Sequence, residues 1–248
     1  MADATGAVRT DPLLRCESRL ATVSGAGAMI LWAGACSPKY RLGGGSVLDT
    51  WQELSAAVED RLAAMSSSER AVFAAGAAER LMSRHEALPE EDRAPFTMSL
   101  RPLLNSVWEG SLGDSTAFTA VKRGMAEYML GEYYHNDGQD GPDDADENAA
   151  ATTLYAAQAY LFECCDFSVW ASRRAVDAVD EHLERLAERE EEVPELAEAT
   201  VAELRRQLRD LDLIAHHSED LHFAVPGLPI GTSIRLRAEL RTPLSARD

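Results

Sequence analysis

The sequence has few cysteines, and their spacing matches neither a zinc site nor a disulfide framework. Its 248 residues include four: Cys16, Cys36, Cys164 and Cys165. There is no Cys-x-x-Cys pair and no spaced quartet of cysteine and histidine, so a zinc module is not expected. Cysteines without disulfide partners are typical of a cytoplasmic protein, in which thiols stay reduced. We expect Cys164 and Cys165 to lie on a helix and to face the protein core.

Long apolar runs are also absent. The nearest to one is "GAGAMILWAGAC" at 25–36, which is shorter than the roughly 20 residues that a membrane-spanning helix needs. It ends in Cys36, somewhat as a lipoprotein cleavage site does. The preceding segment mixes acidic and basic side chains, whereas a secretory leader begins with a short, net positive region. We therefore predict a buried helix at 25–36. A lipoprotein anchored through Cys36 is the alternative.

Positive charge is scarce. Lysine and arginine total 24 and aspartate and glutamate 42, for a formal net charge of −18. Nucleic acid is not expected as a ligand, because a phosphate backbone needs a basic face. An anionic membrane surface is disfavoured for the same reason. The charge remains compatible with a basic protein partner, with metal ions, or with solubility alone.

Helical periodicity runs through most of the chain. Apolar residues recur at helical spacing over 46–65, and "SSSE" at 66–69 forms a capping box that opens a helix running to Pro89. Further helices are expected over 99–109, over 115–134 with Asp114 as its cap, over 148–192 and over 195–217. The 148–192 segment is long for a single helix, so we predict a bend near Asp166–Ser168.

The two ends of the chain differ from its middle. "GGG" at 43–45 separates an N-terminal arm, 1–45, from a helical domain, 46–222, and a tail rich in proline and glycine follows at 223–248. Within the tail, "TSIRLRAEL" alternates apolar with other residues, as one strand would, but a lone strand has no partner. We predict an all-α helical bundle with irregular N- and C-terminal arms.

Three segments carry a family resemblance: "ERLMSRHEAL" (79–88), "LRPLLNSVWEG" (100–110), and an acidic loop followed by "YAAQAYLFECCD" (155–166). Through them, residues 61–220 resemble the YjaG-like family of small helical bacterial proteins of unknown function. The family pattern has a proline and an aromatic residue where this chain has Ser83 and His85. The resemblance implies an all-helical bacterial protein and supplies neither a reaction nor site residues.

An acidic loop at 136–147 is the first candidate site. A calcium-binding helix–loop–helix has carboxylates at its first, third and fifth loop positions and glutamate at the last. If the loop starts at Asp137, its third, fifth and last positions hold Gln139, Gly141 and Asn148, so the calcium-binding pattern is not present. We expect a solvated loop that complements the positive end of a helix beginning near 148. A weak cation site and a partner-binding surface are the alternatives, the surface being formed by Asp140, Asp143, Asp144, Asp146 and Glu147.

Two Glu-x-x-His steps form the second candidate site: Glu132–His135 and Glu219–His222. Di-iron and di-manganese carboxylate bundles use two such steps and one glutamate from each of two further helices, here Glu109 and Glu163. Both steps lie at predicted helix ends, where the helix dipole already favours histidine. We therefore expect no metal site and no cofactor. Iron or manganese held by these six residues is the alternative.

Neither a glycine-rich phosphate loop after a strand nor a nucleophile elbow is present in the sequence. The function predicted from the sequence is therefore that of a non-catalytic, acidic, helical interaction protein. It would bind a basic protein partner, for example as an immunity or regulatory factor. The alternative is a di-iron or di-manganese carboxylate oxidoreductase, and the sequence leaves the oligomeric state open.

Overall fold

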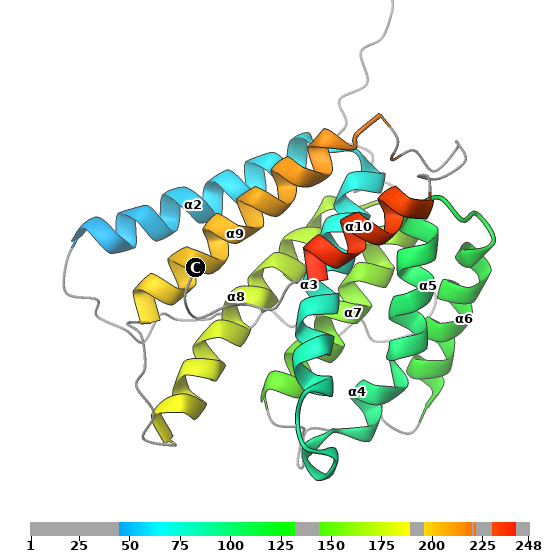
Figure 1. Cartoon of the computed structure of the whole chain (residues 1–248), viewed down its shortest axis with the longest axis horizontal. Coiled ribbons are helices and arrows are strands. Elements are labelled where there is room, and N and C mark those ends of the chain that lie inside the picture. The colour runs from blue at the N-terminus through cyan, green and yellow to red at the C-terminus, as the bar shows by residue number, and fades with distance from the viewer. Residues whose placement is uncertain (1–44, 132–143, 189–195, 220, 222–229, 242–248) are drawn as a thin grey trace, which may run out of the picture. The chain divides into compact units, whose positions relative to one another are not determined.

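The computed structural model describes residues 45–131, 144–188, 196–219, 221 and 230–241, all within the unit Leu42–Asp248. Every regular element in these ranges is a helix, which confirms the predicted all-α fold (Figure 1). The elements are α2 (Gly45–Ala64), α3 (Ser67–Glu86), the 3-10 helix η1 (Glu90–Asp92), α4 (Pro95–Ser99), α5 (Arg101–Ser111), α6 (Ala117–Leu130), α7 (Asp144–Phe162), α8 (Cys165–Glu188), α9 (Leu196–His216) and α10 (Ile230–Arg241).

Within the described ranges, no helix has both the length and the apolar character that crossing a membrane requires. The predicted helix at 25–36 and the alternative anchor at Cys36 lie outside the described residues, as does most of the N-terminal arm.

Helix α3 is the centre of the bundle. Every residue from Ala71 to Met82 is buried, and α5, α7, α8, α9 and α10 all pack against it (Figure 1). Alanine and glycine make up much of this stretch, so the neighbouring helices approach closely. The predicted capping box is confirmed, since the Ser66 amide donates to Glu69 Oε2 at 2.7 Å and the Glu69 amide donates to Ser66 Oγ at 3.3 Å.

Helices α2 and α9 lie side by side at one edge of the bundle (Figure 1). Val58 and Leu62 of α2 and Leu211 and Ile214 of α9 are fully buried. The two helices were expected from apolar periodicity over 46–65 and 195–217, and both predictions are confirmed within two residues at each end.

The predicted break in the long segment after residue 148 is present, but it lies a few residues earlier than expected. Glu163 has a φ of 56°, in the left-handed region that non-glycine residues rarely adopt. The Arg70 guanidinium donates to the Glu163 carbonyl at 3.0 Å, and Ser168 Oγ donates to the Arg70 carbonyl at 3.2 Å. Contacts with α3 thus hold the turn. Cys164 lies in this turn rather than on a helix, and Cys165 starts α8; both are half-buried.

Helices α6 and α7 differ from prediction at their ends. The Asp114 carboxylate accepts from the Thr116 amide at 2.8 Å and orders the turn before α6, which begins at Ala117. Helix α7 begins at Asp144, four residues before the expected start, so part of the predicted acidic loop is helical. Residues 132–143 lie outside the described residues.

The strand considered for "TSIRLRAEL" is wrong, because these residues belong to α10. A strand would place Ile234, Leu236, Ala238 and Leu240 on one face. Instead, Leu236 and Leu240 are buried one helical turn apart, while Ile234 is 64% exposed and Ala238 is also exposed. Part of the expected irregular tail is therefore a helix that packs on α3.

Candidate functional site

Of the six residues proposed for a di-metal site, the three that the structure describes do not lie in the core. Glu109, Glu163 and Glu219 are all exposed to solvent. Apolar neighbours in the sequence had suggested that Glu109 and Glu163 face inward, but one points outward from α5 and the other lies in the turn between α7 and α8. The other three proposed ligands, Glu132, His135 and His222, lie outside the described residues. In the part of the chain that is described, no three histidine, cysteine, aspartate or glutamate residues are grouped so as to hold a metal ion.

The acidic segment is only partly described. Asp140 and Asp143 lie outside the described residues. Asp144, Asp146 and Glu147 occupy the first turn of α7, where negative charge complements the helix dipole, although nothing is described of their side chains. The partner-binding surface predicted there therefore stays a prediction.

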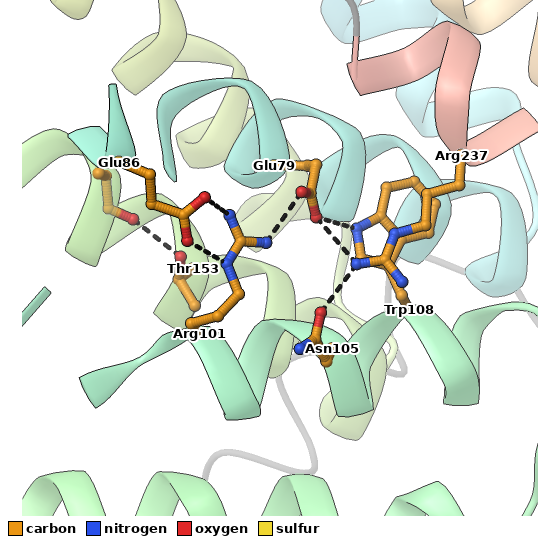
Figure 2. A network of polar contacts seen from close by, with 8 residues as sticks. Glu79, Glu86, Arg101, Asn105, Trp108, Thr153 and Arg237 are labelled. Carbon is orange, nitrogen blue, oxygen red and sulfur yellow. Dashed lines mark hydrogen bonds and ion pairs between the residues drawn. The ribbon is translucent and has the colours of Figure 1, made fainter. Parts of the chain in front are cut away.

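The structure reveals a buried polar network that the sequence analysis missed, centred on Glu79 of α3. Glu79 is 1% exposed. Glu79 Oε1 accepts from Arg101 at 2.8 Å, and Oε2 accepts from Trp108 Nε1 at 2.9 Å and from Arg237 at 3.3 Å (Figure 2). Arg101 also binds both carboxylate oxygens of Glu86, at 2.6 and 2.7 Å. Three helices, α3, α5 and α10, thus meet at one carboxylate.

The electrostatics of Glu79 argue against a catalytic role. Burial alone would raise the pKa of this carboxyl, but the charges of Arg101 and Arg237 and the hydrogen bonds from Arg101 and Trp108 together hold the pKa below its usual range. A carboxylate that stays ionised and accepts from three donors is a poor general acid or base near neutral pH. The network is therefore suited to joining helices.

A second buried network begins at the next residue, Arg80, which is 3% exposed. Its guanidinium pairs with Asp210 at 2.6 Å and with Glu203 at 3.2 Å, both on α9. Gln207 Nε2 donates to the same Glu203 oxygen at 2.9 Å and to the Ser172 carbonyl of α8 at 3.2 Å. This network therefore joins α3, α8 and α9.

One arginine is shared here by two buried carboxylates. Burial raises the pKa of Glu203 and of Asp210, and Arg80 only partly offsets it. The second oxygen of Glu203, Oε2, is buried and has no hydrogen-bond partner among the residues that the structure describes. Arg80 itself stays charged, because the two carboxylates outweigh the effect of burial and raise its pKa.

Both networks hold α10. Arg237 of α10 donates to Glu79 and, at 2.8 Å, to Asn105, and its guanidinium carbon lies 5.4 Å from the centre of the Trp108 ring (Figure 2). Arg80 donates to the Leu240 carbonyl at 3.3 Å. A sequence signal for these networks existed, since the Glu-Arg pair in "FAAGAAERLM" interrupts a stretch of alanine that has no polar face of its own.

A third feature is a group of aromatic side chains at the surface, where α7 turns into α8. We call Tyr155, Phe162, Phe167 and Trp170 the aromatic corner. The ring centres of Phe162 and Phe167 lie 6.0 Å apart, those of Phe167 and Trp170 5.3 Å, and those of Tyr155 and Trp170 5.5 Å. Phe162 is 56% and Trp170 39% exposed. This group of residues was not predicted from the sequence.

Comparison of the chain with protein-family models, with curated proteins and with solved structures finds no match.

Proposed function

We propose that this protein is a non-catalytic, acidic, helical interaction protein that binds a basic protein partner, for example as an immunity or regulatory factor. The observation that supports the proposal is where the charges lie. Three of the four buried acids among the described residues, Glu79, Glu203 and Asp210, pair with arginines. Many of the remaining acids are at the surface, including three consecutive ones in η1, Glu90, Glu91 and Asp92, which are all exposed.

This distribution favours association with a protein of opposite charge. The chain has 42 acidic against 24 basic residues, and of the described acids only Glu69, Glu79, Glu203 and Asp210 are buried. A surface dominated by one sign of charge accelerates encounter with a complementary partner and repels partners of like charge. The same field would make the interaction sensitive to ionic strength.

The segments that resemble the YjaG-like family also contribute to the buried networks. The segments at 79–88 and 100–110, on which the resemblance to the YjaG-like family rests, contribute Glu79, Arg80, Arg101 and Trp108 to the buried networks. If the resemblance reflects kinship, these residues would be shared because they hold the helices together. A cytoplasmic location and a bacterial source belong to the same proposal.

The experiment is to identify and reconstitute the partner. Cross-linking in the native cells, followed by mass spectrometry, names the candidates, and isothermal titration with each purified candidate measures affinity at low and at high salt. We expect a basic protein that binds with fixed stoichiometry and more weakly at high salt. If no candidate forms a stoichiometric complex, or the purified protein carries stoichiometric iron or manganese and turns over a substrate, the proposal is wrong.

A further inference from the structure

The aromatic corner has two exposed rings, Phe162 and Trp170, beside two rings, Tyr155 and Phe167, that are partly buried against the core. Single exposed apolar side chains are common on proteins, but here four rings form a continuous chain of contacts at the surface. Phe162 and Trp170 are the most exposed of them, at 56% and 39%. Large aromatic side chains of this kind supply much of the binding energy at protein interfaces, tryptophan and tyrosine above all.

Two exposed acids, Asp166 and Glu163, lie next to the corner. Asp166 lies one helical turn before Trp170 on α8, so the two side chains share a face, and both are exposed. Glu163, in the turn that precedes α8, is exposed as well. Two arginines are also close: Arg173 pairs with Glu59 of α2 at 2.9 Å, and the Arg70 guanidinium donates to the Glu163 carbonyl at 3.0 Å.

This combination fits one kind of group on a partner. A guanidinium stacks on an indole face through a cation–π interaction and pairs with a carboxylate through charge-assisted hydrogen bonds. Trp170 and Asp166 offer both within one helical turn, and the neighbouring phenylalanine rings offer apolar surface beside them. Lysine would satisfy the charge but lacks the planar group that stacks.

We infer that the aromatic corner is the docking surface for a segment of the basic partner that presents an arginine beside an apolar side chain. This inference rests on the proposed function and names the surface and the partner chemistry that carry it out. The arginine would stack on Trp170 and pair with Asp166, while the apolar side chain covers Phe162. An anionic membrane is disfavoured as the occupant, because Asp166 and Glu163 would repel its headgroups.

The test uses the full chain and a defined probe, a peptide of repeated Arg-Leu-Gly units, with isothermal titration as the readout. Matched peptides replace arginine by citrulline, which removes the charge, or leucine by serine, which removes the apolar group. We expect the Arg-Leu-Gly peptide to bind and each matched peptide to bind at least about tenfold more weakly.

The protein variants locate the site. Trp170→Leu should weaken binding of the Arg-Leu-Gly peptide by about tenfold or more, as loss of a central aromatic contact does. Asp166→Asn, at an exposed position where folding is not at risk, should weaken it by about threefold to tenfold. The controls are Ile234→Ala and Glu239→Gln on α10, an apolar and an acidic residue that are also exposed. Neither should change the affinity.

Three outcomes would overturn the inference. The first is equal binding of the peptide by the wild type and by both corner variants. The second is the absence of any difference between the arginine and citrulline peptides. The third is binding of the wild-type protein to vesicles of phosphatidylcholine with phosphatidylserine in preference to the peptide. None of these outcomes tests whether the protein has a basic partner, because that is decided by reconstitution of the complex with the identified partner. Failure of the docking inference can therefore be distinguished from failure of the proposed function.

Discussion

Glu79 and Arg80 are adjacent in the sequence, yet their side chains pair with different helices. Glu79 binds Arg101 of α5 and Arg237 of α10, whereas Arg80 binds Glu203 and Asp210 of α9. Consecutive residues on a helix point about 100° apart, so one dipeptide in the central helix serves two faces of the bundle. Because both side chains also reach α10, this dipeptide connects the C-terminal helix to the rest of the fold.

Replacing Glu79 by glutamine should destabilise the fold strongly. The variant leaves Arg101 and Arg237 without their buried counter-charge. Loss of one partner from a buried ion pair costs about 3–5 kcal/mol, and we expect a value near 3 because Arg101 keeps Glu86. Urea unfolding followed by circular dichroism measures the change. The control Glu109→Gln, exposed on α5, should cost less than about 0.5 kcal/mol. Equal costs for the two variants would show that the network does not stabilise the fold.

The two networks should respond to pH in opposite directions. The folded-state pKa of Glu203 and of Asp210 is raised by burial, so the folded protein holds their protons more tightly than the unfolded chain. Ionisation of these two carboxyl groups therefore opposes folding. In the unfolded chain their pKa is about 4, so the loss of stability begins near pH 4 and grows until the pH exceeds the folded-state pKa. The pKa of Glu79 is lowered, so its stabilising contribution is present above about pH 4.3 and is lost as pH falls.

Glu203→Gln should accordingly gain stability relative to wild type as pH rises from about 4 to 7. The amide group can keep the carbonyl oxygen toward Arg80 and Gln207 and place its nitrogen where Oε2 now lies. Glu79→Gln should lose stability relative to wild type over the same range. Urea unfolding at several pH values measures both differences. Parallel trends in the two variants would contradict the pKa directions.

Arg237→Gln should loosen α10 before it affects the rest of the bundle. The variant removes the ion pair with Glu79, and the shorter side chain no longer covers the Trp108 ring. We expect amide hydrogen exchange in α10 to quicken by about tenfold or more, which corresponds to loss of about 1.4 kcal/mol of local stability, while α9 is unchanged. Glu239→Gln, exposed on the same helix, is the control. Uniform acceleration in all helices would indicate global rather than local destabilisation.

Two glycine substitutions should have opposite effects. A Cβ at Gly110 would lie 2.9 Å from Cε2 of Tyr160 and closer still to the ring carbon that bears the hydroxyl, so Gly110→Ala forces the ring to move. We expect a loss of about 1–3 kcal/mol, as in other overpacked cores. A Cβ at Gly124 would meet the flexible Cδ1 of Leu103 at 3.1 Å. Gly124→Ala should therefore be neutral or stabilise by up to about 1 kcal/mol through helix propensity.

Thermal and urea unfolding of the two alanine variants test this contrast. The double variant Gly110→Ala with Tyr160→Leu provides the control, because removal of the ring should make the two changes non-additive. If Gly110→Ala alone is as stable as wild type, Tyr160 does not pack over Gly110 as the structure shows.

Local features were predictable from the sequence. The capping box at Ser66 and Glu69, the helices over 46–65 and 195–217, and a break in the segment after residue 148 all depend on residues close together in the chain. Side-chain capping, apolar periodicity and helix length act over a few turns, so the sequence determines them without reference to the rest of the fold.

Partner choice at a distance was decided only by the tertiary structure. Glu79 is 22 residues from Arg101 and 158 from Arg237, and no local pattern selects these two arginines among the others. The same limit applies to α10. Its alternating apolar residues suggested a strand, but in the folded protein Leu240 packs against Gly76 of α3 and its carbonyl accepts a hydrogen bond from Arg80. It applies also to Glu109 and Glu163, whose apolar neighbours gave no indication that they face solvent. A charged side chain is buried where distant helices bring a counter-charge to it, and that arrangement exists only once the helices have packed.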